Sequence, residues 1–114
     1  MGGSLNMPIY NKLVRDRIPE IISASGKTME TRILDQQEYV KELRTKLQEE
    51  TNEYLAAKSD EEALEELADV LELLHALSTA HGFTPDKLEE VRASKAEKRG
   101  GFKDRIYLIE VHDA

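Results

Sequence analysis

Four carboxylate side chains stand in two pairs of equal spacing: Glu50 with Glu53, and Glu66 with Asp69. Residues three apart on a helix project to the same side, so each pair can form a two-carboxylate claw. Two bare carboxylates about 5 Å apart repel each other by roughly 3 kcal/mol at an effective dielectric of about 20, and a divalent cation removes this penalty. All-oxygen ligands in a chain without cysteine favour Mg²⁺, with Mn²⁺ as the alternative, over zinc.

The surroundings of the first claw are apolar on a helical wheel. Glu50 falls within an apolar stripe and Glu53 lies at its edge; the stripe consists of Val40, Leu43, Leu47 and Tyr54. A carboxylate in such a stripe must give up hydration, which only a partner such as a cation can offset. This position favours a metal site over an ordinary surface glutamate.

The second claw lies on a segment that is apolar on two sides. Glu66 and Asp69 share the face of Leu73, Ala76, Leu77 and Ala80, whereas the opposite face carries Leu64, Leu67, Leu71 and Leu74. A helix that is apolar on both sides is usually buried on both sides. The pattern therefore predicts a bundle completed by another subunit, a homo-oligomer that is either a dimer or a tetramer.

The claws require long helices that meet. Asp35 and Ser59, each followed three residues later by glutamate, predict helices from Asp35 to about Lys58 and from about Asp60 to His81, with Gly82 as a left-handed cap. The short turn between them makes the helices antiparallel, so that the claws converge.

Shorter elements are predicted around this hairpin. A helix should begin after Asp16 as N-cap, with Pro19 in its first turn, and end at Gly26. Another should run from Thr84-Pro85 to about Arg99, and residues 28–34 and 105–111 should form strands that can pair. The expected fold is mainly α: an antiparallel helical bundle completed by oligomerisation, with a small β accessory.

Composition limits the class of protein. The chain has 114 residues and a formal charge of -7, which predicts one domain over residues 7–114 and argues against general nucleic-acid binding. Residues 1–6 read as a flexible leader. No apolar run long enough for a membrane span and no signal-peptide pattern is present, so we expect a cytoplasmic protein without membrane association.

A family resemblance adds to this pattern. The motif ETNE at residues 50–53, a 12-residue spacer and ELAD at residues 66–69 resemble the ExxE…ExxD signature of the MazG-like all-α nucleoside triphosphate pyrophosphohydrolases. The opening YNKLVRDRIPEII and the closing KAEKRGGFKDRIYL resemble a small MazG-like subgroup similar to phosphoribosyl-ATP pyrophosphohydrolase. The resemblance therefore covers nearly the whole chain.

The resemblance implies a reaction. A (d)NTP or related nucleotide would be hydrolysed between its α and β phosphates by a metal-activated water, giving a nucleoside monophosphate and pyrophosphate. The implied ligands of Mg²⁺ are Glu50, Glu53, Glu66 and Asp69. Glu49 would orient or deprotonate the water as a catalytic residue, or else is a solvated surface glutamate.

Basic residues supply candidate contacts to the nucleotide phosphates. Lys95, Lys98 and Arg99 precede two glycines, and the resemblance favours phosphate contact over capping of the helix C-terminus. Lys12 and Arg15 are further candidates of this kind. Two alternatives stay open: a true phosphoribosyl-ATP pyrophosphohydrolase of histidine synthesis, and a non-enzymatic helical module for oligomerisation or partner binding.

Overall fold

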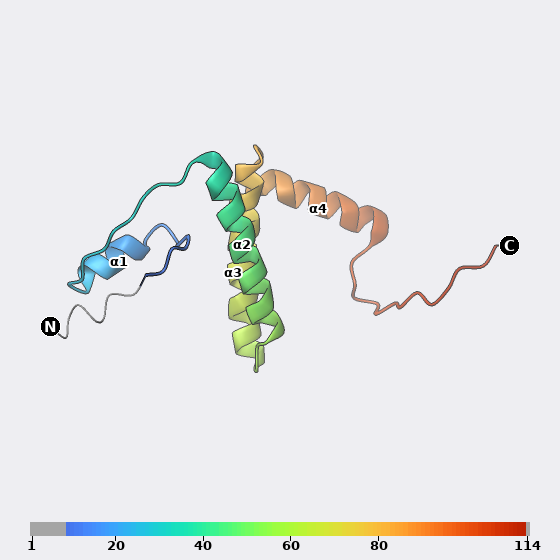
Figure 1. Ribbon diagram of the computed structural model, residues 1–114. Coiled ribbons are helices and arrows are strands. Elements are labelled where there is room, and N and C mark those ends of the chain that lie inside the picture. Colours follow the sequence, from blue (N-terminus) through green and yellow to red (C-terminus); the bar gives the residue numbers. More distant parts are fainter. Residues whose placement is uncertain (1–8, 114) are drawn as a thin grey trace.

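The computed structural model describes residues 9–113 (Figure 1). The helices in this part of the chain are α1 (Ile18–Ala24), α2 (Gln36–Leu55), α3 (Asp60–Ala80) and α4 (Pro85–Arg99). The prediction of a mainly α fold is confirmed. The leader predicted over residues 1–6 lies outside the described residues.

An antiparallel hairpin of α2 and α3 forms the centre of the molecule (Figure 1). The predicted N-caps are confirmed: the Asp35 side chain accepts a hydrogen bond from the Glu38 backbone N–H, and Ser59 Oγ accepts one from the Glu62 N–H. Leu43 of α2 and Leu73 of α3 are buried, with exposed fractions of 3% and 8%. These two leucines form the core of the hairpin.

The turn of the hairpin is longer than the sequence predicted. α2 ends at Leu55 rather than Lys58, so residues 56–59 connect the helices. Ser59 can cap α3 only in an extended conformation, here φ -145° and ψ 163°, and the preceding residues must leave the helix to reach it.

The start of α1 also differs from the prediction. The N-cap residue is Arg17 rather than Asp16, and its side chain makes no capping hydrogen bond. Pro19 lies in the first turn as expected. An N–H group in that turn has no acceptor within the helix, so its absence in proline removes no hydrogen bond. Gly26, with φ +84°, follows the helix end in the left-handed conformation that glycine tolerates best.

The last helix packs against the hairpin only through α3. Thr84 Oγ1 accepts a hydrogen bond from the Lys87 N–H, Pro85 occupies the first turn, and the helix ends at Arg99 as predicted. Among the described residues α4 contacts α3 and no other helix. Figure 1 shows α4 leading away from the hairpin, so its C-terminal end is free of α2 and α3.

The predicted β accessory is wrong for the described residues. Residues 28–34 and 105–111 belong to no strand, and they lie on opposite sides of the hairpin (Figure 1). A strand needs a neighbour about 4.8 Å away to pair its backbone groups, and neither segment has one. Both segments have the alternating side-chain pattern of a strand, but neither lies beside another segment with which its backbone could pair.

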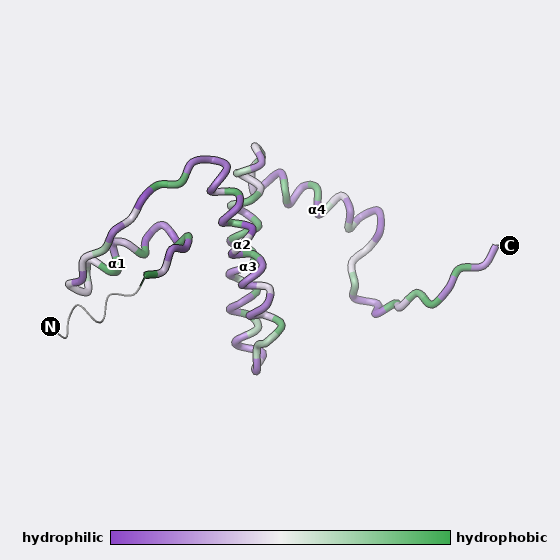
Figure 2. The backbone as a smooth tube through the Cα atoms, viewed as in Figure 1, coloured by the Kyte–Doolittle hydropathy of each residue, from purple (hydrophilic) through white to green (hydrophobic). Residues whose placement is uncertain are grey.

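The described chain is open rather than compact. Its radius of gyration is 19.8 Å and its extents are 77 × 35 × 24 Å, whereas a compact chain of this length has a radius of about 13 Å. Figure 2 shows hydrophobic residues in the extended segments outside the hairpin, and Ile106 and Ile109 are 86% and 87% exposed. Within residues 9–113, no helix has the length and apolar character needed to cross a membrane.

Candidate metal centre

Three carboxylates from the two hairpin helices converge near the turn. Glu50 and Glu53 come from α2 and Glu66 from α3, and one carboxylate oxygen of each lies within 4.8 Å of the others. We call these three residues the carboxylate cluster. The antiparallel hairpin thus brings the first predicted claw together with Glu66 of the second.

Helix periodicity explains why the cluster faces inward. Glu50 follows Leu43 by seven residues and Glu66 precedes Leu73 by seven, so each lies two turns from a buried leucine on the same face of its helix. The contact between the two leucines fixes the rotation of α2 against α3. This rotation also turns Glu50 and Glu66 toward the facing helix. Glu50 and Glu66 are accordingly half-buried, whereas Glu53 is exposed at the rim.

The crowding of the carboxylates favours their protonated forms. Hydrogen bonding with Glu53, followed by burial, raises the pKa of Glu66 to about 7. Burial, followed by the neighbouring Glu53, raises the pKa of Glu50. The ionised cluster is therefore unfavourable unless a cation offsets the repulsion.

Two oxygens of the cluster lack hydrogen-bond partners. Glu50 Oε2 and Glu66 Oε2 are inaccessible to solvent and bond to no donor among the described residues. Buried polar atoms are normally satisfied, so each unsatisfied atom indicates a missing partner. Hard divalent cations take oxygen ligands, and this set of carboxylates fits Mg²⁺ or Mn²⁺.

Asp69, the fourth predicted metal ligand, is not part of the group of three. Its Oδ1 accepts a hydrogen bond of 2.5 Å from Arg15 Nη2, in an ion pair that ties the N-terminal segment to α3. Sequence reasoning missed this pair because its members are 54 residues apart and share no local pattern. Arg15, a predicted phosphate contact, is thus bound to a predicted metal ligand.

The other predicted residues lie outside the cluster. Glu49 is exposed on α2. It is next to Glu50 in sequence, but consecutive residues of a helix point about 100° apart around its axis. The Lys12 Nζ lies 5.4 Å from the centroid of the Tyr10 ring, a cation–π contact. Lys95, Lys98 and Arg99 are exposed on α4. Their predicted roles stay predictions.

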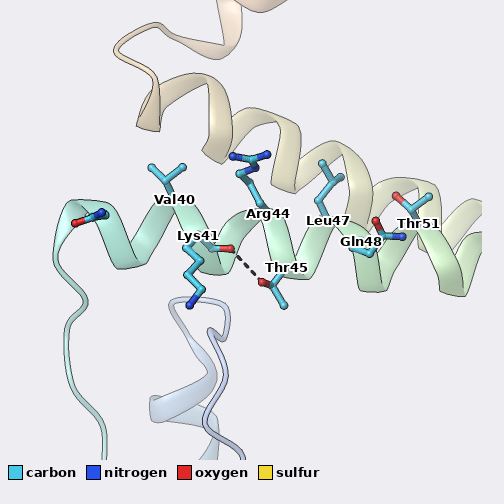
Figure 3. A pocket seen from close by; sticks show the side chains of 8 residues that line it. Val40, Lys41, Arg44, Thr45, Leu47, Gln48 and Thr51 are labelled. Atoms are coloured by element: carbon cyan, nitrogen blue, oxygen red, sulfur yellow. Dashed lines mark hydrogen bonds between the residues drawn. The ribbon is translucent and has the colours of Figure 1, made fainter.

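A groove along α2 was not predicted. It has a volume of about 820 Å³ and is lined only by residues of α2: Gln37, Val40, Lys41, Arg44, Thr45, Leu47, Gln48 and Thr51. Figure 3 shows Arg44 between Val40 and Leu47, with Lys41 and Thr45 projecting to another side. Within residues 9–113 neither Lys41 nor Arg44 forms an ion pair. The three-residue spacing of Lys41 and Arg44 is the sequence feature from which this basic groove could have been predicted.

No protein-family model matches the chain, and no solved structure matches it. The chain is 52% identical over 54 residues to an uncharacterised protein of Mycolicibacterium smegmatis, a match that covers 47% of this chain and 55% of that protein. The match thus spans about half the length of each chain.

Proposed function

We propose that the chain is a Mg²⁺-dependent nucleotide pyrophosphohydrolase that cleaves a (d)NTP or related nucleotide between its α and β phosphates. The observation that carries the proposal is the convergence of Glu50, Glu53 and Glu66 within 4.8 Å, with two of their oxygens buried and unpaired. Such a cluster suits a divalent cation, and divalent cations hold phosphates. The resemblance of the ExxE…ExxD motif supplies the reaction, and we propose that it takes place in the cytoplasm.

Each residue has a defined task in this proposal. Glu50, Glu53 and Glu66 would hold the Mg²⁺, and Asp69 would join them when it leaves Arg15. The chemistry that Mg²⁺ supplies in such sites is neutralisation of phosphate charge and a lowered pKa of water. Glu49 would accept the proton of the water that attacks the α-phosphorus, as the bond to the leaving pyrophosphate breaks.

The oligomeric state belongs to the same proposal. The exposed fractions of Leu64, Leu67 and Leu71 on α3 are 69%, 47% and 51%, so the face opposite α2 is left uncovered by this chain. Burying such a stripe against a second copy is favourable at about 25 cal/mol per Å² of apolar surface. We therefore propose a homo-oligomer, dimer or tetramer, as the working unit.

The test is release of pyrophosphate from a panel of canonical and altered (d)NTPs, and from phosphoribosyl-ATP, with and without Mg²⁺. We expect Mg²⁺-dependent release of equal amounts of pyrophosphate and nucleoside monophosphate. Glu50→Gln and Glu53→Gln should each reduce the rate at least about 100-fold, since each removes a ligand of a catalytic metal. The matched control is Glu61→Gln in the first turn of α3, outside the cluster, which should keep the wild-type rate.

The exposed apolar surface also favours a second candidate, a non-enzymatic helical module for oligomerisation or partner binding. The panel separates the two. Absence of pyrophosphate release from every nucleotide, together with a thermal midpoint that Mg²⁺ does not change, would exclude the hydrolase and leave the module.

A further inference from the structure

The N-terminal arm, defined as residues 9–17, is held to the hairpin by one ion pair. Arg15 Nη2 donates a hydrogen bond of 2.5 Å to Asp69 Oδ1 on α3. Among the described residues no other ion pair joins the arm to α2 or α3. The helix that follows the arm, α1, contacts no other helix of the described chain and lies to one side of the hairpin (Figure 1). A segment attached through one exposed contact can leave it at small cost.

The Arg15 guanidinium uses little of its bonding capacity in this pair. An arginine side chain has five N–H donors in a planar fork, and within residues 9–113 Arg15 donates from one nitrogen to one carboxylate oxygen. The pair thus lacks the two parallel hydrogen bonds of a fork-shaped contact. The Arg15 side chain is 55% exposed. Its other donors are therefore accessible to a second anion.

The pair lies beside the carboxylate cluster. Asp69 follows Glu66 by three residues on α3, so the Cβ atoms of the two residues are about 5–6 Å apart. Glu66 belongs to the cluster, and Arg15 contacts Asp69 directly. A guanidinium of the same chain is therefore within about one helical turn of the proposed metal site.

Binding of a metal and a polyphosphate would change which anion is the better partner for Arg15. Asp69 gains a stronger partner when it turns from the guanidinium to a divalent cation, because such ions prefer carboxylate oxygens. The carboxylates and a polyphosphate together carry more negative charge than one Mg²⁺ neutralises, so a further cation is favourable there. A phosphate group also accepts the two parallel hydrogen bonds that Asp69 does not accept from Arg15.

We propose that Arg15 is shared between Asp69 and the substrate. In the empty site it pairs with Asp69; when Asp69 joins the metal site, Arg15 moves with the N-terminal arm to the phosphates of the nucleotide. The arm is thus a strap that couples metal binding to phosphate binding. The inference rests on the proposed function for the identity of the substrate, but the exchange of partners can be measured without a reaction.

Calorimetric titration tests the exchange through two effects of opposite sign. The probe is methylenediphosphonate, a pyrophosphate analogue whose bridge cannot be hydrolysed, at saturating Mg²⁺. Arg15→Ala should weaken its binding about tenfold or more, because charge-assisted hydrogen bonds to an anion are lost. The same substitution should tighten the binding of Mg²⁺ alone, because Asp69 then has no competing partner.

Arg17→Ala is the matched control, since Arg17 pairs with Glu20 and not with the hairpin. It should change neither affinity. If wild type does not bind the analogue in Mg²⁺, or if Arg15→Ala binds it as tightly as wild type does, Arg15 is no phosphate ligand and the proposal is wrong. A merely structural ion pair would not shift the two affinities in opposite directions.

Limited digestion with trypsin follows the position of the arm in the wild-type chain. Cleavage after Arg15 requires this side chain to enter the protease, so its pair with Asp69 hinders the cut. Cleavage after Lys27, which is exposed beyond the end of α1, is the internal reference. Relative to it, cleavage after Arg15 should become faster with Mg²⁺ alone and slower again when methylenediphosphonate is added. A ratio that neither addition changes would overturn the exchange.

Failure of this proposal differs from failure of the proposed function. If wild type releases pyrophosphate from a nucleotide but Arg15→Ala leaves the affinity for the analogue unchanged, the hydrolase stands and the exchange is wrong. If no nucleotide yields pyrophosphate, the hydrolase is wrong. The opposite shifts in the two affinities then decide alone whether Arg15 passes from Asp69 to a metal-bound anion.

Discussion

In the metal site proposed at the carboxylate cluster, a proton and a metal ion would compete for the same oxygens. Glu66, whose pKa is raised to about 7 by Glu53 and by burial, holds a proton near neutral pH in the absence of metal. Ligand carboxylates must be ionised, so a divalent cation must displace that proton. Metal affinity and pH are therefore linked through this one side chain.

The first prediction concerns pH and stability in Mg²⁺-free buffer. The ordinary pKa of Glu66 is 4.5 and its pKa in the folded chain is about 7, so the folded state binds more protons between these values. The stabilisation is complete below pH 4.5 and is lost as pH rises through about 7. We expect the thermal midpoint to fall between pH 5.5 and about 8, as measured by circular dichroism.

Two comparisons isolate the residue responsible. Glu66→Gln should flatten this part of the profile, because its amide carries no titrating proton, whereas Glu72→Gln on the exposed side of α3 should keep the wild-type slope. Saturating Mg²⁺ should also remove the fall. A wild-type midpoint that rises over the same range would contradict the assignment.

The second prediction concerns the ion pair of Arg15 and Asp69. The guanidinium neutralises a carboxylate beside the cluster, so it competes with a metal ion for Asp69. The side chains are 55% and 40% exposed, and such pairs contribute about 0.2 to 1 kcal/mol. Arg15→Ala should therefore tighten Mg²⁺ or Mn²⁺ binding by at most about fivefold in calorimetric titration.

Arg17→Ala is the matched control for this titration. Arg17 pairs with Glu20 within the N-terminal region and does not contact the cluster. Its removal should leave metal affinity unchanged. Weaker binding by the Arg15→Ala variant would mean that the guanidinium supports the site instead of competing for it.

At the scale of elements, the hairpin depends on a small core. Leu43 and Leu73 are the buried hydrophobic residues of the described chain, and they also set the rotation of the helices that brings Glu50 and Glu66 together. Stability and the metal site should therefore change together when this contact is weakened.

The third prediction follows from this dependence. Leu43→Ala should lower the free energy of unfolding by about 2 to 4 kcal/mol, because it removes buried methyl groups and leaves a cavity. Leu55→Ala, at a side chain that is 73% exposed, should change it by less than about 0.5 kcal/mol. Urea denaturation measures both, and equal effects would show that Leu43 is not the core of the hairpin.

The elements also show what the sequence could predict. The caps Asp35 and Ser59 were predicted correctly because each acts within four residues of itself. The approach of Glu66 to Glu50 and Glu53 could be predicted because a short connection makes the two helices antiparallel. Other features depend on the path of the chain through space, which no local pattern encodes. They are the ion pair of Arg15 with Asp69 and the lack of a neighbouring strand beside residues 105–111.

At the scale of the whole molecule, many large apolar side chains of the described residues are exposed. Its described part is 77 Å long with two buried hydrophobic residues, and exposed apolar patches of this kind mark interfaces. On the hairpin, this exposed apolar surface includes the face of α3 that carries Leu64, Leu67 and Leu71. Folding and association should therefore be linked.

The last prediction is that stability depends on protein concentration. If dimers fold and monomers do not, the thermal midpoint rises with concentration by mass action. Leu67→Glu should abolish this dependence, since it places a charge on the apolar stripe, whereas Glu72→Gln should preserve it. Sedimentation equilibrium supplies the second measurement, in which wild type should show a mass above that of the monomer. A midpoint independent of concentration in wild type, with monomer mass in sedimentation, would contradict association, because the stripe would then be stable in water without a partner.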